Sequence, residues 1–461
     1  MQITVSTNKP DARFSLTTLT EDSLPPRVSR KALIIGIGKR EEMTRRKLFI
    51  LPRKIVQTGK QHRLKQLAVT LDDFRFPQTK NISSEALAAL VAENLVLANF
   101  ESTQLKTPPK EGWPTIEEVT IVVENTREKA AVTRGVKRGR TIADEVNKCR
   151  ELANTPGGDM TPKILAEEAK RAAEGTKVKV SVLGLKELLR LKMGAILGVS
   201  KGSTEEPRFI ILEYKAGGRQ KPIVLAGKGV TFDSGGLNVK PGDSMYEMHM
   251  DMSGGAAVIH AVILAAKLGL KKNVIGLVPA VENMPSGSSY HPGDVLRSMS
   301  GKTIEVLNTD AEGRVILADA LTYAKRYKPR LVVDVATLTG AALVALGQHA
   351  SAIMTRDQKL QDLFCELGEE SGDYVWPLPL WDEYEEYIKG TFGDISNLPS
   401  SGNQRYGGTI NGGMFLYQFA KEYPWVHIDM APRMTTIPSD VLSKGAAGAP
   451  VRLLVKLIER F

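Results

Sequence analysis

The chain has 461 residues, of which 42% are apolar and 25% charged, and its formal net charge is +10. These proportions are typical of a globular protein with a buried core, and they exclude a disordered, collagenous or coiled-coil chain. Two cysteines (Cys149 and Cys365), no apolar leader segment and no run of 18 apolar residues indicate a cytoplasmic protein without a membrane span.

The basic excess lies in the first third of the chain. Residues 1–150 hold 27 Lys and Arg against 17 Asp and Glu, and the remaining residues hold 35 of each class. Such a region could contact nucleic acid phosphates, although its basic stretches at 45–47 and 134–140 lack interleaved aromatic residues. The alternative interpretation is a solvated surface, or a face that meets an acidic neighbour in an oligomer.

The N-terminal third alternates between short apolar runs and helical periodicity. Strand-like runs occupy 32–37, 47–51 and 118–123, and a helical pattern occupies 83–99. This alternation predicts a small α/β unit.

A long polar helix is expected over 127–153, where the sequence Asn154-Thr155-Pro156 and two glycines then stop it. We interpret this helix as the connection between two domains. The N-terminal α/β domain would span 1–138 and include the start of the helix, and the larger domain would span 139–461.

Strands and helices alternate through the larger domain. Helices are predicted at 256–268 and, with an amphipathic pattern, at 315–327. Strands are predicted at 177–183, 208–214, 222–226, 273–279, 330–336 and 425–430. Continuous β-branched runs between helices predict an α/β fold whose central mixed sheet is covered by helices on both faces. Ligands of such sheets collect at the carboxyl ends of the strands.

The first group of candidate residues follows the strand at 222–226. Lys228 lies between two glycines, which let the backbone approach another group closely, and Asp233 follows it. A phosphate-binding loop is the alternative, but the spacing fails GxxxxGK[ST]. The segment Asp233-Ser234-Gly235-Gly236 also resembles a serine protease nucleophile, yet only His62 precedes it and the context is α/β.

Two further groups carry carboxylates. Asp251 directly precedes a helix that starts among small residues, so it could be an N-cap or a ligand. Asp310, Glu312 and Arg314 recur with period two, and in an extended segment all three would point to one side. The alternative is a capping segment in which the acids face the helix dipole.

Together these segments offer four carboxylates, two lysines (Lys228 and Lys240) and one arginine. Hard oxygen ligands in that number suit one or two divalent cations. The histidines have no metal-binding spacing and are interpreted as structural: His62, His249, His260, His291, His349 and His427.

Four segments resemble the leucyl aminopeptidases, also called cytosol aminopeptidases, of peptidase family M17. They are GKGVTFDSGG (227–236), NVKP (238–241), NTDAEGR (308–314) and DVATLTGA (334–341), in the family's order and spacing. The resemblance covers the chain from about residue 140 onwards, and the earlier part matches in position and α/β character only.

The resemblance implies the following metal ligands. Asp233 and Glu312 would bridge two divalent ions, Mn or Zn. Lys228 and Asp251 would complete the tighter site, and Asp310 the more readily exchanged one. A lysine ligates a metal only as the free amine, so Lys228 must be neutral in that state.

The resemblance also implies that Lys240 and Arg314 are catalytic. Lys240 would stay charged and stabilise the developing oxyanion, and Arg314 would hold a bicarbonate ion that serves as general base. The residues around the substrate would be Lys240, Met248, Thr337 and Leu338, with Met434 opposite Met248.

The implied function is a metal-dependent leucyl aminopeptidase that removes apolar N-terminal residues from peptides in intracellular turnover, assembled as a homohexamer. The alternative class is a nucleic-acid-binding regulator that acts through the basic N-terminal third. A two-metal phosphatase or nuclease shares the carboxylates but explains neither the lysine ligand nor the TLTG segment.

Overall fold

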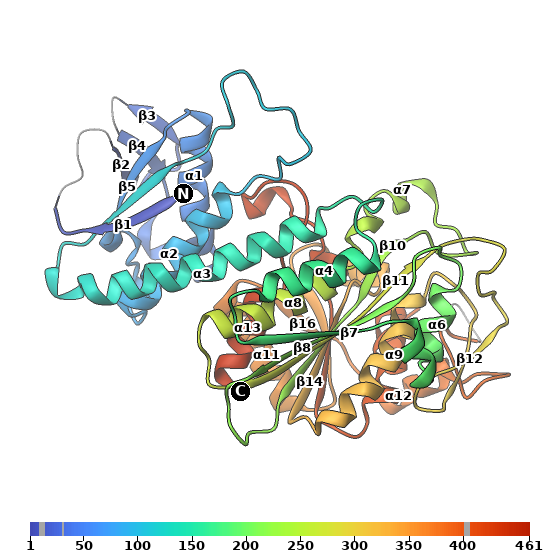
Figure 1. The fold of residues 1–461 in the computed structure, drawn as a ribbon. Helices are drawn as coiled ribbons and strands as arrows, with labels where there is room; N and C mark the ends of the chain where they lie inside the picture. Colours follow the sequence, from blue (N-terminus) through green and yellow to red (C-terminus); the bar gives the residue numbers. More distant parts are fainter. Residues whose placement is uncertain (9–13, 30–31, 401–405) are drawn as a thin grey trace. The chain divides into compact units, whose positions relative to one another are not determined.

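The computed structural model describes residues 1–8, 14–29, 32–400 and 406–461 (Figure 1). The chain forms two units. The first consists of residues 1–147 and 436–445, and the second of residues 148–435 and 446–461.

The first unit contains a six-stranded sheet. Its order is β1 (Gln2–Ser6), β6 (Glu118–Val122), β5 (Gln66–Thr70), β2 (Ser15–Thr20), β4 (Ala32–Gly36) and β3 (Arg27–Ser29). All neighbouring strands are parallel except the antiparallel pair β3 and β4. Helices α1 (Arg45–Gln61) and α2 (Ser84–Asn99) supply much of the apolar core of this unit.

The strand predicted at 47–51 is wrong, because these residues lie inside α1. Thr44 caps this helix, and its hydroxyl accepts a hydrogen bond from the Lys47 backbone N–H. Leu48, Leu51 and Ile55 are buried, which is the spacing of a helix face. A five-residue apolar run cannot by itself distinguish a strand from a helix turn. The predicted strands at 32–37 and 118–123 and the helix at 83–99 are confirmed.

The long polar helix is confirmed as α3 (Lys129–Ala153), which continues from the first unit into the second. Two glycines in its first half allow close packing on α2. A β-carbon on Gly135 or Gly139 would lie 2.1 Å from the carbonyl oxygens of Glu85 and Ala89, respectively. Glycine is therefore required at both positions.

The second unit is built on a nine-stranded mixed sheet. Its order is β16 (Val375–Pro377), β15 (Ser351–Met354), β18 (Trp425–Asp429), β14 (Leu331–Ala336), β9 (Ile223–Gly227), β11 (Asn273–Asn283), β8 (Arg208–Lys215) and β7 (Val178–Leu183), and β10 (Gly229–Asp233) pairs with β11. Each of the six strands predicted for this unit is present.

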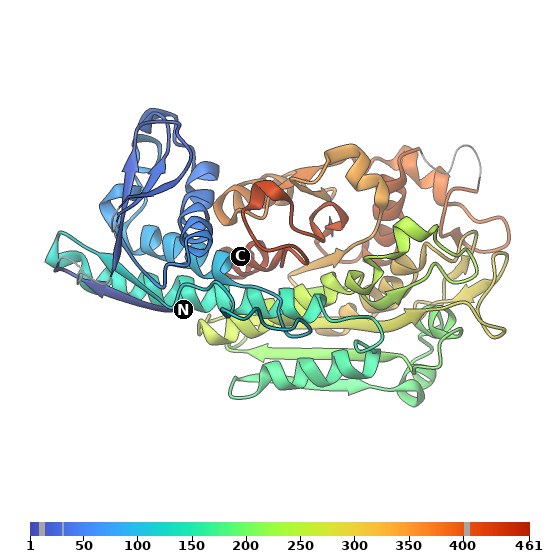
Figure 2. The same cartoon turned by 90° about the horizontal axis from the view of Figure 1, so that it is seen from above.

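Helices cover both faces of this sheet, as Figures 1 and 2 show. One layer holds α4 (Pro162–Ala173), α8 (Ser253–Lys267), α11 (Gln358–Ser371) and α13 (Val451–Arg460). The other holds α6 (Gly194–Ser200), α9 (Glu312–Ala324) and α12 (Gly408–Ala420). The predicted α/β class with a covered mixed sheet is thus confirmed.

Two helical segments are buried more completely than their sequence patterns alone would indicate. The helical stretch Gly242–Lys267 is long and apolar enough to cross a membrane by length and composition alone, but 89% of its apolar window is buried inside the protein. Helix α9, predicted as amphipathic over 315–327, begins at Glu312 and is buried along almost its whole length. It is buried on all sides because it packs between the sheet and α12.

The strand ends position the polar residues. Strands β9, β10, β11 and β14 run parallel to one another, so their carboxyl ends lie at one edge of the sheet. Lys228 follows β9, Asp233 ends β10, Asn283 ends β11 and Thr337 follows β14. Strands β12 (Val295–Arg297) and β13 (Thr303–Glu305) precede the loop that carries Asp310, and β17 (Ile395–Ser396) pairs with β13 to complete a small three-stranded sheet.

Candidate metal and catalytic site

Lys228 lies at the centre of one half of the site. Its Nζ is 2.7 Å from Oδ2 of Asp251 and 2.8 Å from Oε1 of Glu312. The same ammonium donates a hydrogen bond of 3.0 Å to the Thr337 carbonyl oxygen. All four residues are buried. Burial alone would lower the pKa of Lys228, but the charges of Asp251 and Glu312 outweigh it and raise the pKa above its usual range.

Lys240 lies at the centre of the other half. Its Nζ is 2.8 Å from Oδ2 of Asp233 and 2.5 Å from Oδ1 of Asp310. Burial again opposes the charged form, and the neighbouring carboxylates, Asp233 first, raise the pKa of Lys240. The four predicted carboxylates and two predicted lysines therefore form two adjacent ion-pair groups.

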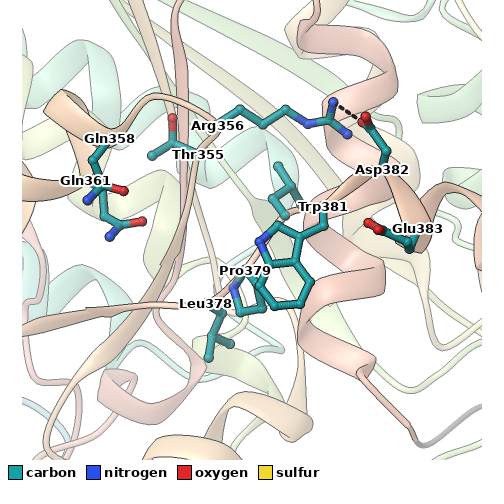
Figure 3. A pocket seen from close by; sticks show the side chains of 10 residues that line it. Thr355, Arg356, Gln358, Gln361, Leu378, Pro379, Trp381, Asp382 and Glu383 are labelled. Atoms are coloured by element: carbon teal, nitrogen blue, oxygen red, sulfur yellow. Dashed lines mark ion pairs between the residues drawn. The ribbon is translucent and has the colours of Figure 1, made fainter.

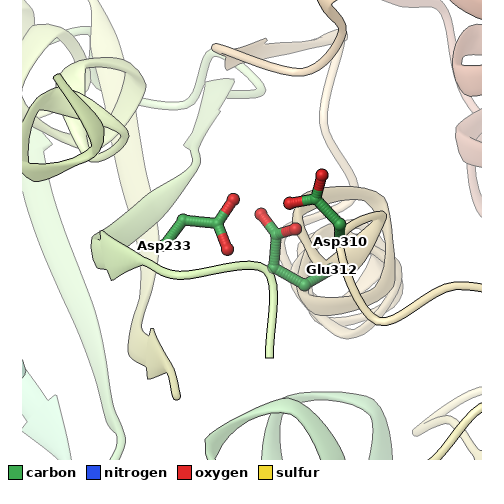
Figure 4. A group of neighbouring side chains, drawn as sticks. All are labelled: Asp233, Asp310 and Glu312. Atoms are coloured by element: carbon green, nitrogen blue, oxygen red, sulfur yellow. The ribbon is translucent and has the colours of Figure 1, made fainter. Parts of the chain in front are cut away.

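Three of these carboxylates could share one cation. Ligand oxygens of Asp233, Asp310 and Glu312 all lie within 4.8 Å of one another. Figure 4 shows the three side chains turned toward a common space, Asp233 from the end of its strand, Glu312 from the start of α9 and Asp310 from the loop before that helix.

The residues fit divalent cations on two grounds. Oxygen Oδ2 of Asp251, Oδ1 of Asp310 and Oε1 of Glu312 are buried, and within the described residues each has a lysine ammonium as its polar contact and accepts no hydrogen bond from another group. When ionised, the four carboxylates exceed the two lysines by two negative charges, and uncompensated charge is costly to bury. Hard carboxylate oxygens in this number suit Mg, Mn or Zn ions.

The excess negative charge also acts on the carboxyl groups themselves. Burial raises the pKa of Asp251, Asp310 and Glu312, and their mutual repulsion raises it further against the opposing effect of the lysines.

Asn283 positions Asp233, and sequence reasoning missed it. Its Nδ2 donates to Oδ1 of Asp233 at 2.8 Å and to the Thr309 carbonyl at 2.9 Å. The backbone N–H of Gly235 also donates to Oδ1 of Asp233, at 2.9 Å. The available signal was an amide side chain at the end of the long apolar strand β11, where an unpaired polar group would be costly.

Asp251 is not an N-cap. Helix α8 begins at Ser253 and has no side-chain cap. Oxygen Oδ1 of Asp251 instead accepts a 2.6 Å hydrogen bond from the Thr337 hydroxyl. Thr337 thus orients one oxygen of Asp251 and leaves the other toward Lys228.

The expectation that Asp310, Glu312 and Arg314 share one side is wrong, because Glu312 and Arg314 form the first turn of α9. Residues two apart on a helix point in different directions. Arg314 is buried and donates from Nη1 to the Asn397 carbonyl at 2.9 Å. Burial lowers its pKa to about 10. Within the described residues Arg314 forms no ion pair, and its buried Nε donates no hydrogen bond.

The remaining predicted residues, Met248, Leu338 and Met434, lie on three further segments. Met248 is half-buried in the short helix η5 (Met248–Met250), which packs against β10. The Leu338 backbone N–H donates to Oδ1 of Asp429 at 3.1 Å. Met434 directly follows η8 (Ala431–Arg433), which packs against α10 (Gly340–Leu346).

The serine protease alternative finds no support in the geometry. The Ser234 hydroxyl donates a hydrogen bond of 2.6 Å to the Asn283 backbone carbonyl oxygen, which is a structural role. His427 contacts Asp334 on the neighbouring strand, with Nδ1 and Oδ1 2.5 Å apart.

A cavity of about 490 Å³ lies elsewhere in the second unit (Figure 3). Trp381 lines it, and Arg356 pairs with Asp382 beside it. Strand β15 leads into this cavity and runs antiparallel to β18, so the cavity lies at the opposite edge of the sheet from Lys228 and Asp233. It contains none of the predicted residues.

A covered α/β sheet with buried carboxylates and lysines at its strand ends defines a hydrolase-like site suited to divalent cations. Comparison with known families narrows this class. The model described as "Cytosol aminopeptidase family, catalytic domain" matches residues 147–455, and the N-terminal domain of the same family matches residues 16–109. The chain belongs to the cytosol aminopeptidase family. It is accordingly an aminopeptidase, a hydrolase that acts on peptides.

Individual relatives support the same family assignment. A probable cytosol aminopeptidase of Saccharophagus degradans is 42% identical over 434 residues, which cover 93% of this chain and 85% of the relative. One from Burkholderia pseudomallei is 40% identical over 432 residues, covering 93% and 84%. Among solved structures, "Bottromycin maturation enzyme BotP in complex with Mn" is similar with a TM-score of 0.84, 29% identity and 99% coverage of both chains.

Proposed function

We propose that this chain is a two-metal aminopeptidase that preferentially removes apolar N-terminal residues, leucine among them, from peptides. The excess of four buried carboxylates over two lysines carries the proposal, because cations at this edge of the sheet would balance it. The manganese in the description of the BotP structure supports the same ligand chemistry in a similar fold.

The two ion-pair groups correspond to two cation sites. Lys228, Asp251 and Glu312 would form one, with the lysine as neutral amine, and Asp310 would belong to the other. Asp233 and Glu312 would be shared between them. When bound, the ions would supply Lewis acidity to the scissile carbonyl and to the attacking water.

Lys240 and Arg314 supply the charges that act on the substrate. The side chain of Lys240 is 14% exposed, more than that of Lys228, and a charged ammonium there can stabilise negative charge on the carbonyl oxygen. Arg314 has a buried guanidinium with an unbonded Nε. We assign a small anion such as bicarbonate to this guanidinium, where it would accept the proton of the water.

The proposed preference for apolar N-terminal residues of the substrate rests on two methionines. Met248 and Met434 lie on elements that pack near Asp233 and the Leu338 segment. A flexible thioether adapts to leucine or methionine side chains.

The test uses chelated full-length protein with leucine amide, Leu-Gly-Gly and N-acetyl-Leu-Gly-Gly. We expect hydrolysis of the first two to require added Mn or Zn and the acetylated peptide to resist, because its blocked amine is a poor metal ligand. Metal-independent activity would refute the metal mechanism. Equal cleavage of both peptides would refute aminopeptidase action.

For the assembly and location, we propose a homohexamer in the cytoplasm, supported by family membership. Light scattering of the purified protein tests the assembly.

Nucleic-acid binding has weaker support, because Arg134 and Arg140 of the basic stretch pair locally with Glu85 and Asp144.

A further inference from the structure

The first unit has a cavity of its own, of about 620 Å³, whose volume is in the range of small-molecule sites. It lies at the carboxyl ends of two parallel strands, β2 and β4. Their following segments are joined by two backbone hydrogen bonds, from Ile37 N–H to the Thr20 carbonyl at 3.0 Å and from Gly38 N–H to the Asp22 carbonyl at 2.9 Å. In open parallel sheets this edge is where ligands bind.

Glycine fixes the shape of one wall. A β-carbon on Gly36 would lie 2.6 Å from Oδ1 of Asp22 and 2.7 Å from the Leu24 carbonyl, so any other residue would push the 21–26 segment away. That segment contributes Leu24, which is 55% exposed, and Pro25 and Pro26 to the lining. With Ile37 they make this wall apolar.

Helix α1 forms the opposite wall, and its lining is polar and positive. Lys47, Lys54 and Gln61 are seven residues apart, so they lie along one face of the helix. The Lys47 ammonium donates to the Glu42 backbone carbonyl at 3.0 Å. Neither lysine pairs with a carboxylate within the described residues, and Glu42 is the one acidic residue of the lining.

We propose that this cavity binds a small organic anion, a molecule with an apolar body and one phosphate or carboxylate group. The apolar wall would cover the body, and Lys47 and Lys54 would bind the anionic group by charge-assisted hydrogen bonds. This site is separate from the peptidase residues, and the proposal does not depend on the proposed function.

The experiment is calorimetric titration of the full-length protein with phenyl phosphate and, separately, phenylacetate, with benzyl alcohol as the neutral analogue. We expect saturable binding of at least one anion and none of the alcohol. The variant K47Q/K54Q should bind about tenfold or more weakly, which corresponds to the loss of one charge-assisted hydrogen bond.

The control is K106Q/K110Q, which removes the same charge from exposed lysines outside the cavity. It should bind as the unaltered protein does, and both variants should keep full activity on leucine amide. Preference for phenyl phosphate or for phenylacetate identifies the anionic group. Failure of both anions to bind, or equal affinity of K47Q/K54Q and the unaltered protein, overturns the proposal.

Discussion

Lys228 reaches Glu312 across the surface of Gly313. Its ammonium lies 2.8 Å from Oε1 of Glu312. A β-carbon on Gly313 would lie 2.6 Å from Cε of Lys228 and 2.8 Å from both Cδ and Nζ. The glycine of the NTDAEGR segment is thus required for the close approach of a lysine that lies 85 positions earlier in the chain.

This relationship predicts the effect of Gly313→Ala. Alanine favours a helix over glycine by about 1 kcal/mol, so the substitution should not harm α9 itself. Its methyl group should displace Lys228 and weaken metal binding by about tenfold or more, the effect expected when ligand positioning is lost. Titration of the chelated protein with Mn measures the affinity. Gly340→Ala is the control, because apart from its chain neighbours and the backbone of its own helix no atom lies within 4 Å of its β-carbon position. Unchanged Mn affinity of the Gly313→Ala variant would contradict the role assigned to Lys228.

The two lysines should give different phenotypes. Lys240→Ala should retain metal while turnover of leucine amide falls by about 10²–10³-fold, the loss typical of one oxyanion-stabilising donor. Lys228→Ala should instead lose metal affinity, because it removes a ligand from the more buried group. Metal content and turnover, measured on the same samples, separate the two. Exchanged phenotypes would show that the ligand and the catalytic lysine are assigned the wrong way round.

The carboxylates should differ in how many ions they hold. Asp233→Ala should lose both ions and all activity, because this residue would be shared between the sites. Asp310→Ala should lose mainly one ion, since Asp310 is the less buried of the two. Metal analysis after gel filtration counts the ions, with the exposed Asp243→Ala as control. An Asp233→Ala protein that keeps two ions per chain would refute the bridging role.

Much of the site could be predicted from sequence because its residues directly follow apolar strands. Glycines flank Lys228, and carboxylates interrupt otherwise apolar segments, so their cost of burial is visible in the sequence. The residues that contact them could not be predicted from the sequence. Asn283 and Asn397 act through contacts with segments 26 and 83 positions away, at Thr309 and Arg314.

The two wrong predictions, for the start of α9 and for a strand at 47–51, have a related cause. Helix α9 begins at Glu312, earlier than its apolar periodicity suggests, because tertiary contacts to Lys228 and Asn397 hold its charged first turn in the interior. The false strand at 47–51 reflects a short apolar run whose helical context comes from Thr44 and the residues that follow. In each case the deciding interactions lie outside the window that the pattern covers.

A buried pair beneath the site predicts a pH dependence of stability. His427 and Asp334 lie side by side on β18 and β14, both inaccessible to solvent, and Nε1 of Trp425 donates to the second oxygen of Asp334 at 2.6 Å. Burial alone would lower the pKa of His427, but the charge of Asp334 and its hydrogen bond outweigh it and raise the pKa above the ordinary value of 6.5.

A raised pKa in the folded state means that folding favours the protonated imidazole. The stabilisation is complete below the ordinary pKa of about 6.5 and is lost as the pH rises through the higher, folded-state value. The difference in unfolding free energy between the unaltered protein and His427→Gln should therefore be larger near pH 6 than near pH 8.5. Urea unfolding followed by tryptophan fluorescence measures it across this range. Asp334→Asn should lose most of this pH dependence, because it removes the charge that raises the pKa. A free-energy difference that stays constant with pH would show that folding leaves the pKa of His427 unchanged, and one that is smaller near pH 6 than near pH 8.5 would show that folding lowers it.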